Sequence, residues 1–278
     1  MRKVFLIASA VWAIFLTGCS KDNDTNDNIT GNNPPLLKKL SLLTGSDSLG
    51  TVTYTYDNLN RVSTAFFRSI ESGTLSFVDN FTFHYASSDS LPDYFIDNSQ
   101  DLVTGDTYTA GEYFYYDASR RMIKDSLFEV GAGSLVYQFQ YFPSYIKVIT
   151  DFGDETRSYQ TISNGNIIQE KDTITRISGD IKVDIQQAFD NRINPLFRTQ
   201  IKRPVLYLSE NFFTDYEIVP TMPNNATSFV QSKTALSGNT VTQRTYTYTY
   251  NADNTPATVI INDLSGGGST IKGIYQYY

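Results

Sequence analysis

The chain has 278 residues, of which 40% are hydrophobic, and its formal net charge is −7 at pH 7. An acidic surface of this kind offers no electrostatic footprint for DNA or RNA, and it repels anionic lipid. We therefore expect no nucleic-acid partner, and we expect membrane contact to come from a lipid anchor rather than from surface charge.

Residues 1–18 have the pattern of a secretory signal. Two basic residues lead, an apolar run too short to span a bilayer follows over residues 4–16, and small residues come next. The junction Leu16-Thr17-Gly18-Cys19 resembles the lipobox of bacterial lipoproteins, in which the cut falls before an acylated cysteine. The resemblance implies that Cys19 carries lipid and attaches the mature chain to the membrane. An uncleaved anchor and a plain signal peptide are the alternatives.

Cys19 is the only cysteine. Once it is lipidated, no thiol remains for a disulfide or for a cysteine-liganded metal, so packing and hydrogen bonds must hold the fold. The only tryptophan, Trp12, lies in the signal, whereas the chain has 20 Tyr and 18 Phe. Tyrosine, phenylalanine and threonine in such numbers favour strands.

Residues 19–36 are expected to form a polar tether, because they have almost no apolar side chains with which to offset the entropy of ordering. Lys21-Asp22 and Asp24 resemble the charged export signal of Bacteroidota surface lipoproteins. That resemblance implies a lipid-anchored protein of the outer membrane, at the cell surface rather than on the periplasmic face. A generic polar tether is the alternative.

Residues 37–278 are expected to form a single β domain. Polar and aromatic residues alternate in Thr51–Tyr56, Phe81–Tyr85, Val136–Tyr141 and Thr245–Tyr250, and alternation with a period of two indicates half-buried strands. Turn residues recur too closely for helices to intervene, so neighbouring strands should be antiparallel. The pattern predicts an all-β fold of about a dozen or more strands: a large curved meander, either an open roll or a barrel-like sheet.

One segment interrupts this rhythm. Residues 192–225 contain Pro195, Pro204, Pro220 and Pro223, and proline cannot donate to a sheet ladder. We expect an irregular segment here, with a packed loop or short helix over residues 205–216. Such a segment is expected to cover an open edge or an end of the sheet.

A hairpin sequence also recurs. Tyr54-Thr-Tyr-Asp57-Asn-Leu-Asn-Arg61 returns as Phe114-Tyr-Tyr-Asp117-Ala-Ser-Arg-Arg121, with weaker copies at Phe189–Pro195 and Tyr248–Pro256. In each good copy an aromatic strand ends at an aspartate, and the aspartate is expected to accept backbone N–H bonds two or three residues on.

These units resemble the YD repeats of Rhs-type proteins, whose core is Tyr-x-Tyr-Asp-x-x-Gly-Arg. Asn60 and Arg120 stand where that family has glycine. The whole chain is also similar to Bacteroidota lipoproteins of unknown function, which carry a signal, a polar tether and YD-like hairpins. That resemblance implies a curved antiparallel sheet and brings no activity with it.

No catalytic constellation is visible. His84 is the sole histidine, so triads and multi-histidine metal sites lack partners, and we interpret it as a structural or surface residue. Asp151-Phe-Gly-Asp-Glu155 suits either a calcium ligand set or, in our preferred interpretation, a solvated turn. We expect no cofactor and no metal. A pair of acids acting on a glycan stays open, because a glycosidase needs only two suitably spaced carboxylates.

Four segments fit the pattern Asp-Ser/Thr-aliphatic. This pattern resembles the acceptor motif of the Bacteroidota O-glycosylation system and implies sugar on Ser48, Ser90, Ser126 and Thr173. Composition alone produces about two such matches, so chance is the alternative.

Three functions follow as hypotheses. The first is a non-catalytic envelope lipoprotein that binds a glycan or a surface protein, or serves a structural role. The second is a glycan-active enzyme with an Asp/Glu pair, and the third is a lipid-handling or membrane-embedded barrel. A buried aromatic face with a wet Thr/Ser-rich face favours the first, two facing carboxylates in a cleft favour the second, and an outward apolar band about 25 Å tall favours membrane embedding.

Overall fold

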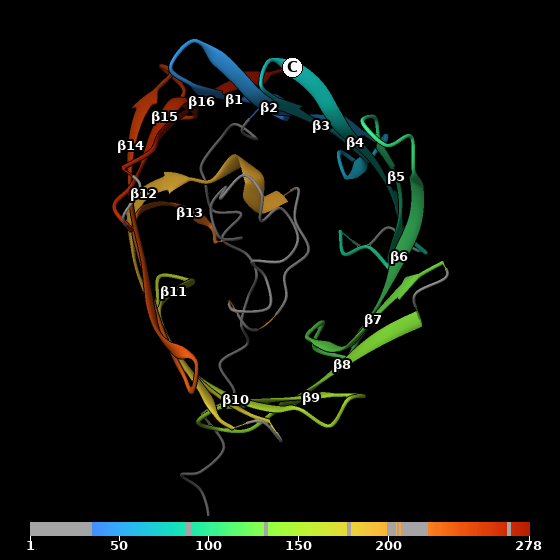
Figure 1. Cartoon of the computed structure of the whole chain (residues 1–278), viewed down its shortest axis with the longest axis vertical. Coiled ribbons are helices and arrows are strands. Elements are labelled where there is room, and N and C mark those ends of the chain that lie inside the picture. The colour runs from blue at the N-terminus through green and yellow to red at the C-terminus, as the bar shows by residue number, and fades with distance from the viewer. Residues whose placement is uncertain are drawn as a thin grey trace, which may run out of the picture. The chain divides into compact units, whose positions relative to one another are not determined.

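The structure is a computed structural model, and it describes residues 35–86, 90–130, 133–176, 179–198, 204, 206, 222–265 and 268–278. Its strands close into one antiparallel barrel (Figure 1). The strands are β1 Leu37–Thr44, β2 Asp47–Tyr56, β3 Val62–Glu71, β4 Thr74–His84, β5 Tyr94–Asp101, β6 Thr107–Tyr116, β7 Met122–Glu129, β8 Gly133–Tyr141, β9 Ile146–Thr150, β10 Glu155–Ser163, β11 Asn166–Thr175, β12 Ile181–Ile193, β13 Asn224–Ala235, β14 Gly238–Tyr250, β15 Pro256–Asp263 and β16 Thr270–Tyr277.

Each strand pairs with the next one along the chain, and β16 pairs back with β1. The closing register places Leu37 opposite Tyr277 and Leu40 opposite Tyr275. The expected all-β meander is therefore confirmed, and of the two forms left open by the sequence the barrel is the correct one. Closure leaves no free strand edge in the sheet, which removes the usual site of edge-to-edge aggregation.

Side chains alternate between the two faces of the wall, as strand geometry requires. Tyr54 is 2% exposed on the inner face, and its neighbours Thr53 and Thr55 lie on the outer face. The same alternation places Tyr246 inside and Thr247 outside. The alternation found in the sequence thus places the tyrosines and the threonines of these strands on opposite faces.

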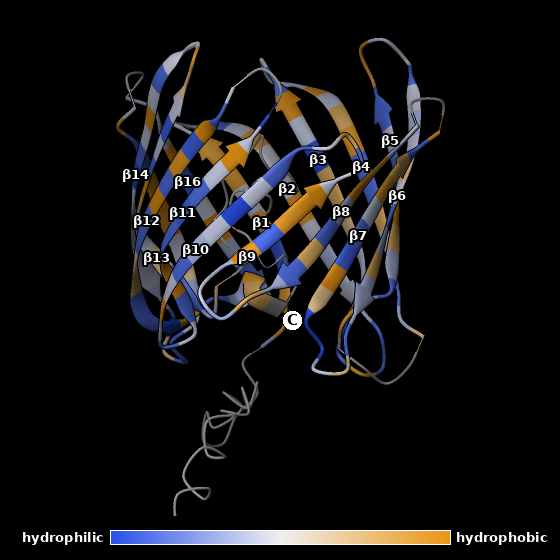
Figure 2. Cartoon of the chain, turned by 90° about the horizontal axis from the view of Figure 1, so that it is seen from below, coloured by the Kyte–Doolittle hydropathy of each residue, from blue (hydrophilic) through white to orange (hydrophobic). Residues whose placement is uncertain are grey.

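The core follows the inner face around the ring. Its buried members come from nearly every strand, and cross-strand partners such as Leu40 and Val52, or Val259 and Gly273, share that face. Figure 2 shows hydrophilic and hydrophobic residues alternating along the strands, without a continuous hydrophobic ring. Among the described residues, no helix has the length and hydropathy needed to cross a bilayer.

The barrel has two unlike ends. We call the end at which β1 begins and β16 ends the terminal end; it also holds the turns at 57–61, 117–121 and 251–255. The opposite, distal end holds the turns after β1, β3, β5, β7, β9, β13 and β15. In Figure 2 the C-terminus marks the terminal end at the bottom of the barrel.

The proline-rich connection between β12 and β13 turns inward where it is described. It starts with a 3-10 helix, Pro195–Arg198, and Figure 1 shows this coil inside the ring. Leu196 is 1% exposed. Gln160 donates to the carbonyl of Pro204 (2.6 Å), and the N–H of Leu206 donates to the Glu170 carboxylate (2.9 Å).

The irregular or short-helical segment expected at 192–225 is thus present, with β12 extending to residue 193 and β13 starting at 224. The expectation that it covers an open edge is wrong, because a closed barrel has none. Most of the packed loop or short helix expected at 205–216 lies outside the described residues, as do the signal, Cys19 and the tether up to residue 34.

Candidate functional site

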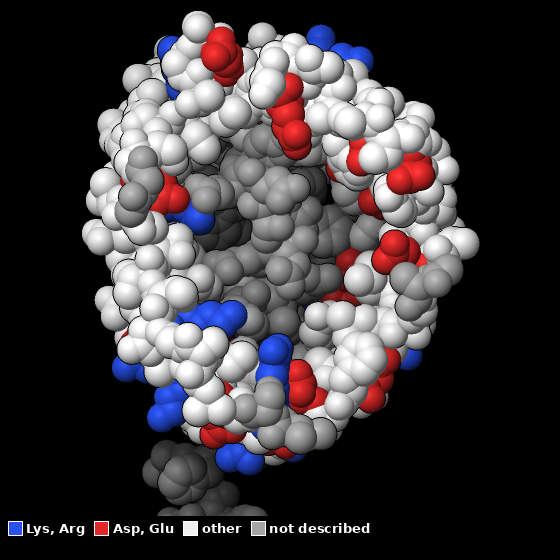
Figure 3. Space-filling view, in the orientation of Figure 1, with Lys and Arg blue, Asp and Glu red and all other residues white. Residues whose placement is uncertain are grey.

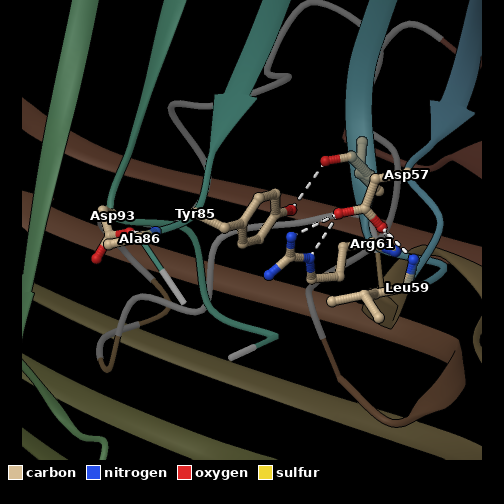
Figure 4. Close-up of polar contacts among 7 residues, drawn as sticks. Asp57, Leu59, Arg61, Tyr85, Ala86 and Asp93 are labelled. Atoms are coloured by element: carbon tan, nitrogen blue, oxygen red, sulfur yellow. Dashed lines mark hydrogen bonds and ion pairs between the residues drawn. The ribbon is translucent and has the colours of Figure 1, made fainter. Parts of the chain in front are cut away.

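The turn between β2 and β3 is organised by Asp57 (Figure 4). One carboxylate oxygen accepts the N–H groups of Leu59 and Arg61, both at 2.9 Å. The other accepts Nε of Arg61 at 2.7 Å and forms an ion pair with its Nη2 at 2.6 Å. Burial raises the pKa of the Asp57 carboxyl, but the bonds from Arg61 and Leu59 outweigh burial and hold that pKa below its ordinary value. The predicted aspartate cap is present, with N–H donors two and four residues on instead of the expected two or three.

Arg61 is held from its other side by an aromatic ring. Its guanidinium lies over the ring of Tyr85, 4.2 Å from the centroid, and the hydroxyl of Tyr85 donates to the carbonyl of Val62 at 2.9 Å. Figure 4 shows Tyr85 reaching from its own strand end toward this turn. Burial raises the pKa of Tyr85 to about 12. The turn is therefore tied to a strand that follows it by more than twenty residues.

The turn between β6 and β7 has the same construction. Asp117 accepts the N–H groups of Ser119 and Arg121 at 2.9 Å and pairs with the Arg121 guanidinium at 2.7 Å. That guanidinium lies 4.5 Å from the ring centroid of Tyr141, whose hydroxyl donates to Met122 at 2.8 Å. Two turns that lie sixty residues apart in the chain thus have the same hydrogen-bonded arrangement.

Both turns need a left-handed residue just before the arginine. Asn60 has φ 59° and Arg120 has φ 63°. These are the positions at which the YD family carries glycine, the residue that adopts this conformation without steric cost. The family likeness remains an expectation, but the local backbone it implies is present.

The weaker copies keep parts of the arrangement. Asp190 accepts the N–H of Arg192 at 2.9 Å, and the Arg192 guanidinium lies 3.9 Å from the ring centroid of Tyr250. The hydroxyl of Tyr250 donates to the Asp190 carboxylate. At the β14–β15 turn, Asn254 has φ 66° and occupies the left-handed position.

A feature that sequence reasoning missed is a set of tyrosine clasps at the terminal end. At the end of five even-numbered strands, a tyrosine hydroxyl donates to a backbone carbonyl at or just before the start of the preceding strand. The pairs are Tyr56–Leu37 (2.8 Å), Tyr85–Val62 (2.9 Å), Tyr116–Pro92 (3.0 Å), Tyr141–Met122 (2.8 Å) and Tyr277–Pro256 (2.9 Å). Each clasp closes the open end of one hairpin. The available signal was the tyrosine that ends each aromatic run, which we interpreted only as core.

Acidic side chains share the inner face of β4–β7. They are Asp79, Asp97, Glu112 and Asp125, and Figure 3 shows acidic residues gathered along this side of the barrel mouth. Glu112 and Asp125 are 0% exposed. Burial raises the pKa of Asp97 to about 6, and one backbone hydrogen bond from Asn80 opposes the rise.

Neither of the two buried acids is open to solvent, so a polysaccharide does not reach them in this state. Among the described residues, no group of three or more His, Cys, Asp or Glu side chains is placed to hold a metal ion. Within Asp151–Glu155, Asp154 pairs with Arg176 at 3.0 Å and Glu155 with Lys147 at 2.7 Å. The segment is a turn whose paired carboxylates face cations.

The outer face of the wall carries charged and hydroxyl side chains. Glu155 also pairs with Arg157 at 3.0 Å, and Lys171 lies 3.9 Å from Asp184. Thr249 and Thr258 share a hydrogen bond of 2.7 Å across β14 and β15. Hydrogen bonds from Lys147 and Arg157 hold the pKa of Glu155 below its ordinary value. Charged and hydroxyl side chains of this kind are suited to contact with water.

One aromatic row runs along the outer face of β4–β7. The ring centroids of His84 and Tyr94 are 4.3 Å apart, those of Tyr94 and Tyr113 are 5.1 Å apart, and those of Tyr113 and Phe128 are 5.8 Å apart. These rings contact one another from strand to strand, and cross-strand pairing explains the row better than a platform for sugars. His84 is thus a half-buried residue of the outer face, stacked on Tyr94.

The structure does not bring the expected glycosylation residues together. Ser48 lies near the start of β2, Ser126 in β7 and Thr173 in β11, whereas Ser90 lies in the bend before β5. The acids that precede two of them, Asp125 and Asp172, are 0% and 3% exposed. In the folded barrel, an enzyme that reads the aspartate would not find it at these two sites.

Comparisons with known proteins give the fold and no family. No protein-family model matches the chain, and no curated protein matches it. A porin-like protein from Bacteroides uniformis has 13% identity and a TM-score of 0.50, with 89% of this chain and 99% of that chain covered. A porin-like protein from Bacteroides vulgatus has 8% identity and a TM-score of 0.43, with 88% and 99% covered. The first likeness shows the barrel fold.

Proposed function

We propose that the chain is a non-catalytic β-barrel of the bacterial outer membrane, anchored by lipid on Cys19, whose wall stands in water and serves as a binding or structural module. Its barrel fold is similar to that of a Bacteroides porin-like protein, and its leader resembles that of a lipoprotein. The buried acids on the inner face support the non-catalytic part of the proposal.

The polarity of the wall is the observation that carries the proposal. A membrane-embedded barrel presents an apolar band outward, and a lysine or arginine at the bilayer midplane costs about 2–4 kcal/mol. Here the buried core side chains are on the inner face, and the outer face of β9–β12 carries Lys147, Arg157 and Lys171 beside carboxylates. A wet polar face over a buried aromatic face is the pattern expected of a water-facing module.

A membrane-embedded barrel is the second candidate, because the structural neighbour is porin-like and the outer face of β4–β7 carries an aromatic row. Fractionation separates the two. In the native host, the parent chain is expected in the outer-membrane fraction, and Cys19→Ala is expected to leave the membrane pellet during an alkaline carbonate wash. Retention in the washed pellet of a variant from which the leader has been removed would contradict a water-facing wall, since an uncleaved leader would itself hold the chain in the membrane.

Conductance is the second test of the same proposal. Residues 20–278, purified without detergent, are expected to produce no channel currents in a planar bilayer, since the described part of the β12–β13 connection lies against the inner wall. The barrel needs no strand from residues 1–34, because all of its strand pairs lie within residues 37–277. Stable step currents would establish a pore instead.

A further inference from the structure

The most exposed apolar side chains in the described part of the chain gather at one end. Val103, Val130, Phe152 and Leu236 are 72–85% exposed, and each lies in a distal-end turn, after β5, β7, β9 and β13 respectively. We call these four residues the apolar crown. Isolated exposed apolar residues are ordinary, but four of them on the turns of one end form a surface that needs an explanation.

The backbone under the crown is fixed. Asp101 accepts the N–H groups of Val103 (2.8 Å) and Thr104 (3.0 Å), and the N–H of Val130 donates to the carbonyl of Thr109 at 3.0 Å. The turn around Phe152 is closed by Gly153, whose N–H donates to Thr150 at 3.0 Å. The turns therefore hold the apolar side chains out in solvent, and docking them requires little further ordering.

We propose that the apolar crown docks the distal end of the barrel onto a lipid surface. The crown side chains sit on separate turns around the ring, and a fluid lipid surface accepts separate apolar tips without a matching pocket for each. The covalent reach from Cys19 to Pro35 is about 55 Å at full extension. A strand of 8 to 13 residues spans about 27–44 Å, and less along the tilted barrel axis. A chain anchored at Cys19 is thus long enough to place the distal end at the same membrane.

The charged side chains beside the apolar crown determine which lipid headgroups it can approach. Asp101 and Asp106 flank Val103, Glu129 precedes Val130, and Asp151 precedes Phe152. These carboxylates repel anionic headgroups and tolerate zwitterionic ones. The inference rests on the proposed water-facing barrel, and it revises the sequence expectation that membrane contact comes from acyl chains alone.

A tryptophan placed in the crown gives the sharpest test. Residues 20–278 contain no tryptophan, so Phe152→Trp carries the only one. With phosphatidylcholine vesicles, its emission is expected to shift to the blue and to be quenched by lipids labelled in the acyl chain. Leu59→Trp is the matched control, because Leu59 is a 52% exposed turn residue of the terminal end, and its emission should not change. Equal shifts at both positions, or none at Phe152→Trp, would overturn the proposal.

Flotation adds an independent readout. The parent 20–278 chain is expected to float with phosphatidylcholine vesicles, whereas a fourfold serine variant of the crown should lose at least about tenfold in bound fraction. Leu59→Ser should float like the parent, and circular dichroism checks that each variant is folded. Vesicles with one quarter phosphatidylglycerol should bind less of the parent protein at low salt, and the bound fraction should recover in 0.5 M salt. Stronger binding to the anionic vesicles would contradict the proposal. Channel currents address only the water-facing wall, so failure there is distinguishable from failure of the crown.

Discussion

Arg61 and Tyr85 hold each other in place although β3 and β4 separate them in the chain. The guanidinium of Arg61 lies 4.2 Å from the ring centroid of Tyr85, and the hydroxyl of that ring donates to the residue that follows Arg61. Arg121 and Tyr141 repeat this relationship at 4.5 Å. The terminal end is thus tied together by side chains as well as by the ladder.

Removing one hydroxyl tests the clasps. Tyr85→Phe and Tyr141→Phe keep the ring under the arginine and remove only the donor, so each is expected to lower the free energy of unfolding by about 0.5–1.5 kcal/mol. The two losses should add, because the sites share no partner. Urea denaturation followed by circular dichroism measures both. Tyr108→Phe, on a 43% exposed side chain, should change little, and equal effects at all three positions would argue against the clasps.

The clasps also predict an alkaline transition. Burial raises the pKa of Tyr85 and Tyr141 from 10 to about 12, so the folded protein holds these protons more tightly than the unfolded chain. The stabilisation is complete below pH 10 and is lost as the pH rises from 10 through 12. Thermal melts across this interval are expected to show a steeper fall for the parent than for the double phenylalanine variant. An equal fall in melting temperature for the parent and the double variant would contradict the assignment of this pH dependence to Tyr85 and Tyr141.

Glycine at the two left-handed positions should stabilise the turns. Arg120 has φ 63° and Asn60 has φ 59°, and arginine pays a larger steric cost there than asparagine. Arg120→Gly is expected to raise the free energy of unfolding by about 0.5–1 kcal/mol and Asn60→Gly by less. Ser119→Gly, in the same turn but without positive φ, should destabilise. The urea midpoints of unfolding should fall in the order Arg120→Gly, Asn60→Gly, Ser119→Gly, from highest to lowest.

Asp97 should behave as a buried acid that opposes folding. Its pKa of about 6 exceeds the ordinary 3.8, so the folded state holds the proton more tightly and stability falls as the pH rises from about 4 to 6. Asp97→Asn is expected to gain about 2–3 kcal/mol at pH 7.5 and to flatten the pH dependence. Asp101→Asn, at the end of the same strand, should instead lower the free energy of unfolding at pH 7.5, because hydrogen bonds from Thr104 and Val103 hold the pKa of Asp101 low.

Gly111 makes room for an aromatic ring on the outer wall. A Cβ at this position would lie 2.4 Å from the ring of Phe128 and 3.0 Å from Ile96. Gly111→Ala is therefore expected to cost about 1–3 kcal/mol. In a Phe128→Leu background the same change should cost less, and this coupling is read from a double-mutant cycle in urea. An unchanged cost in that background would mean that the ring is not the obstacle.

The alternation of tyrosine and threonine was enough to place Tyr54 inside and Thr55 outside, because a half-buried strand has a period of two residues. It was also enough to place the aspartate caps, since a carboxylate at the end of a strand has only nearby N–H groups to accept. Closure could not be derived this way. The pairing of Leu37 with Tyr277 joins residues with no local signal for each other, and a roll with free edges has the same alternation.

The clasps and the crown escaped prediction for related reasons. Tyr85 and Val62 are 23 residues apart, and nothing local to either one indicates the bond. The crown depends on which turns share an end, and that follows only from the complete strand order. The inward course of the β12–β13 connection likewise required a lumen to enter, which a sequence read as an open sheet does not provide.

The seam between β1 and β16 makes completion of the chain a condition of the fold. β1 comes before all the other strands of the barrel and its closing partner β16 comes after them, so the sheet keeps two unpaired edges until β16 has paired with β1. The hydroxyl of Tyr278 then donates to the carbonyl of Tyr54 at 2.8 Å across this seam. A chain that lacks β16 cannot close the barrel. Its unpaired strand edges stay exposed to proteases and to pairing with neighbouring chains. Pairing of β1 with β16 thereby makes the barrel depend on its two most distant strands being present in the same chain.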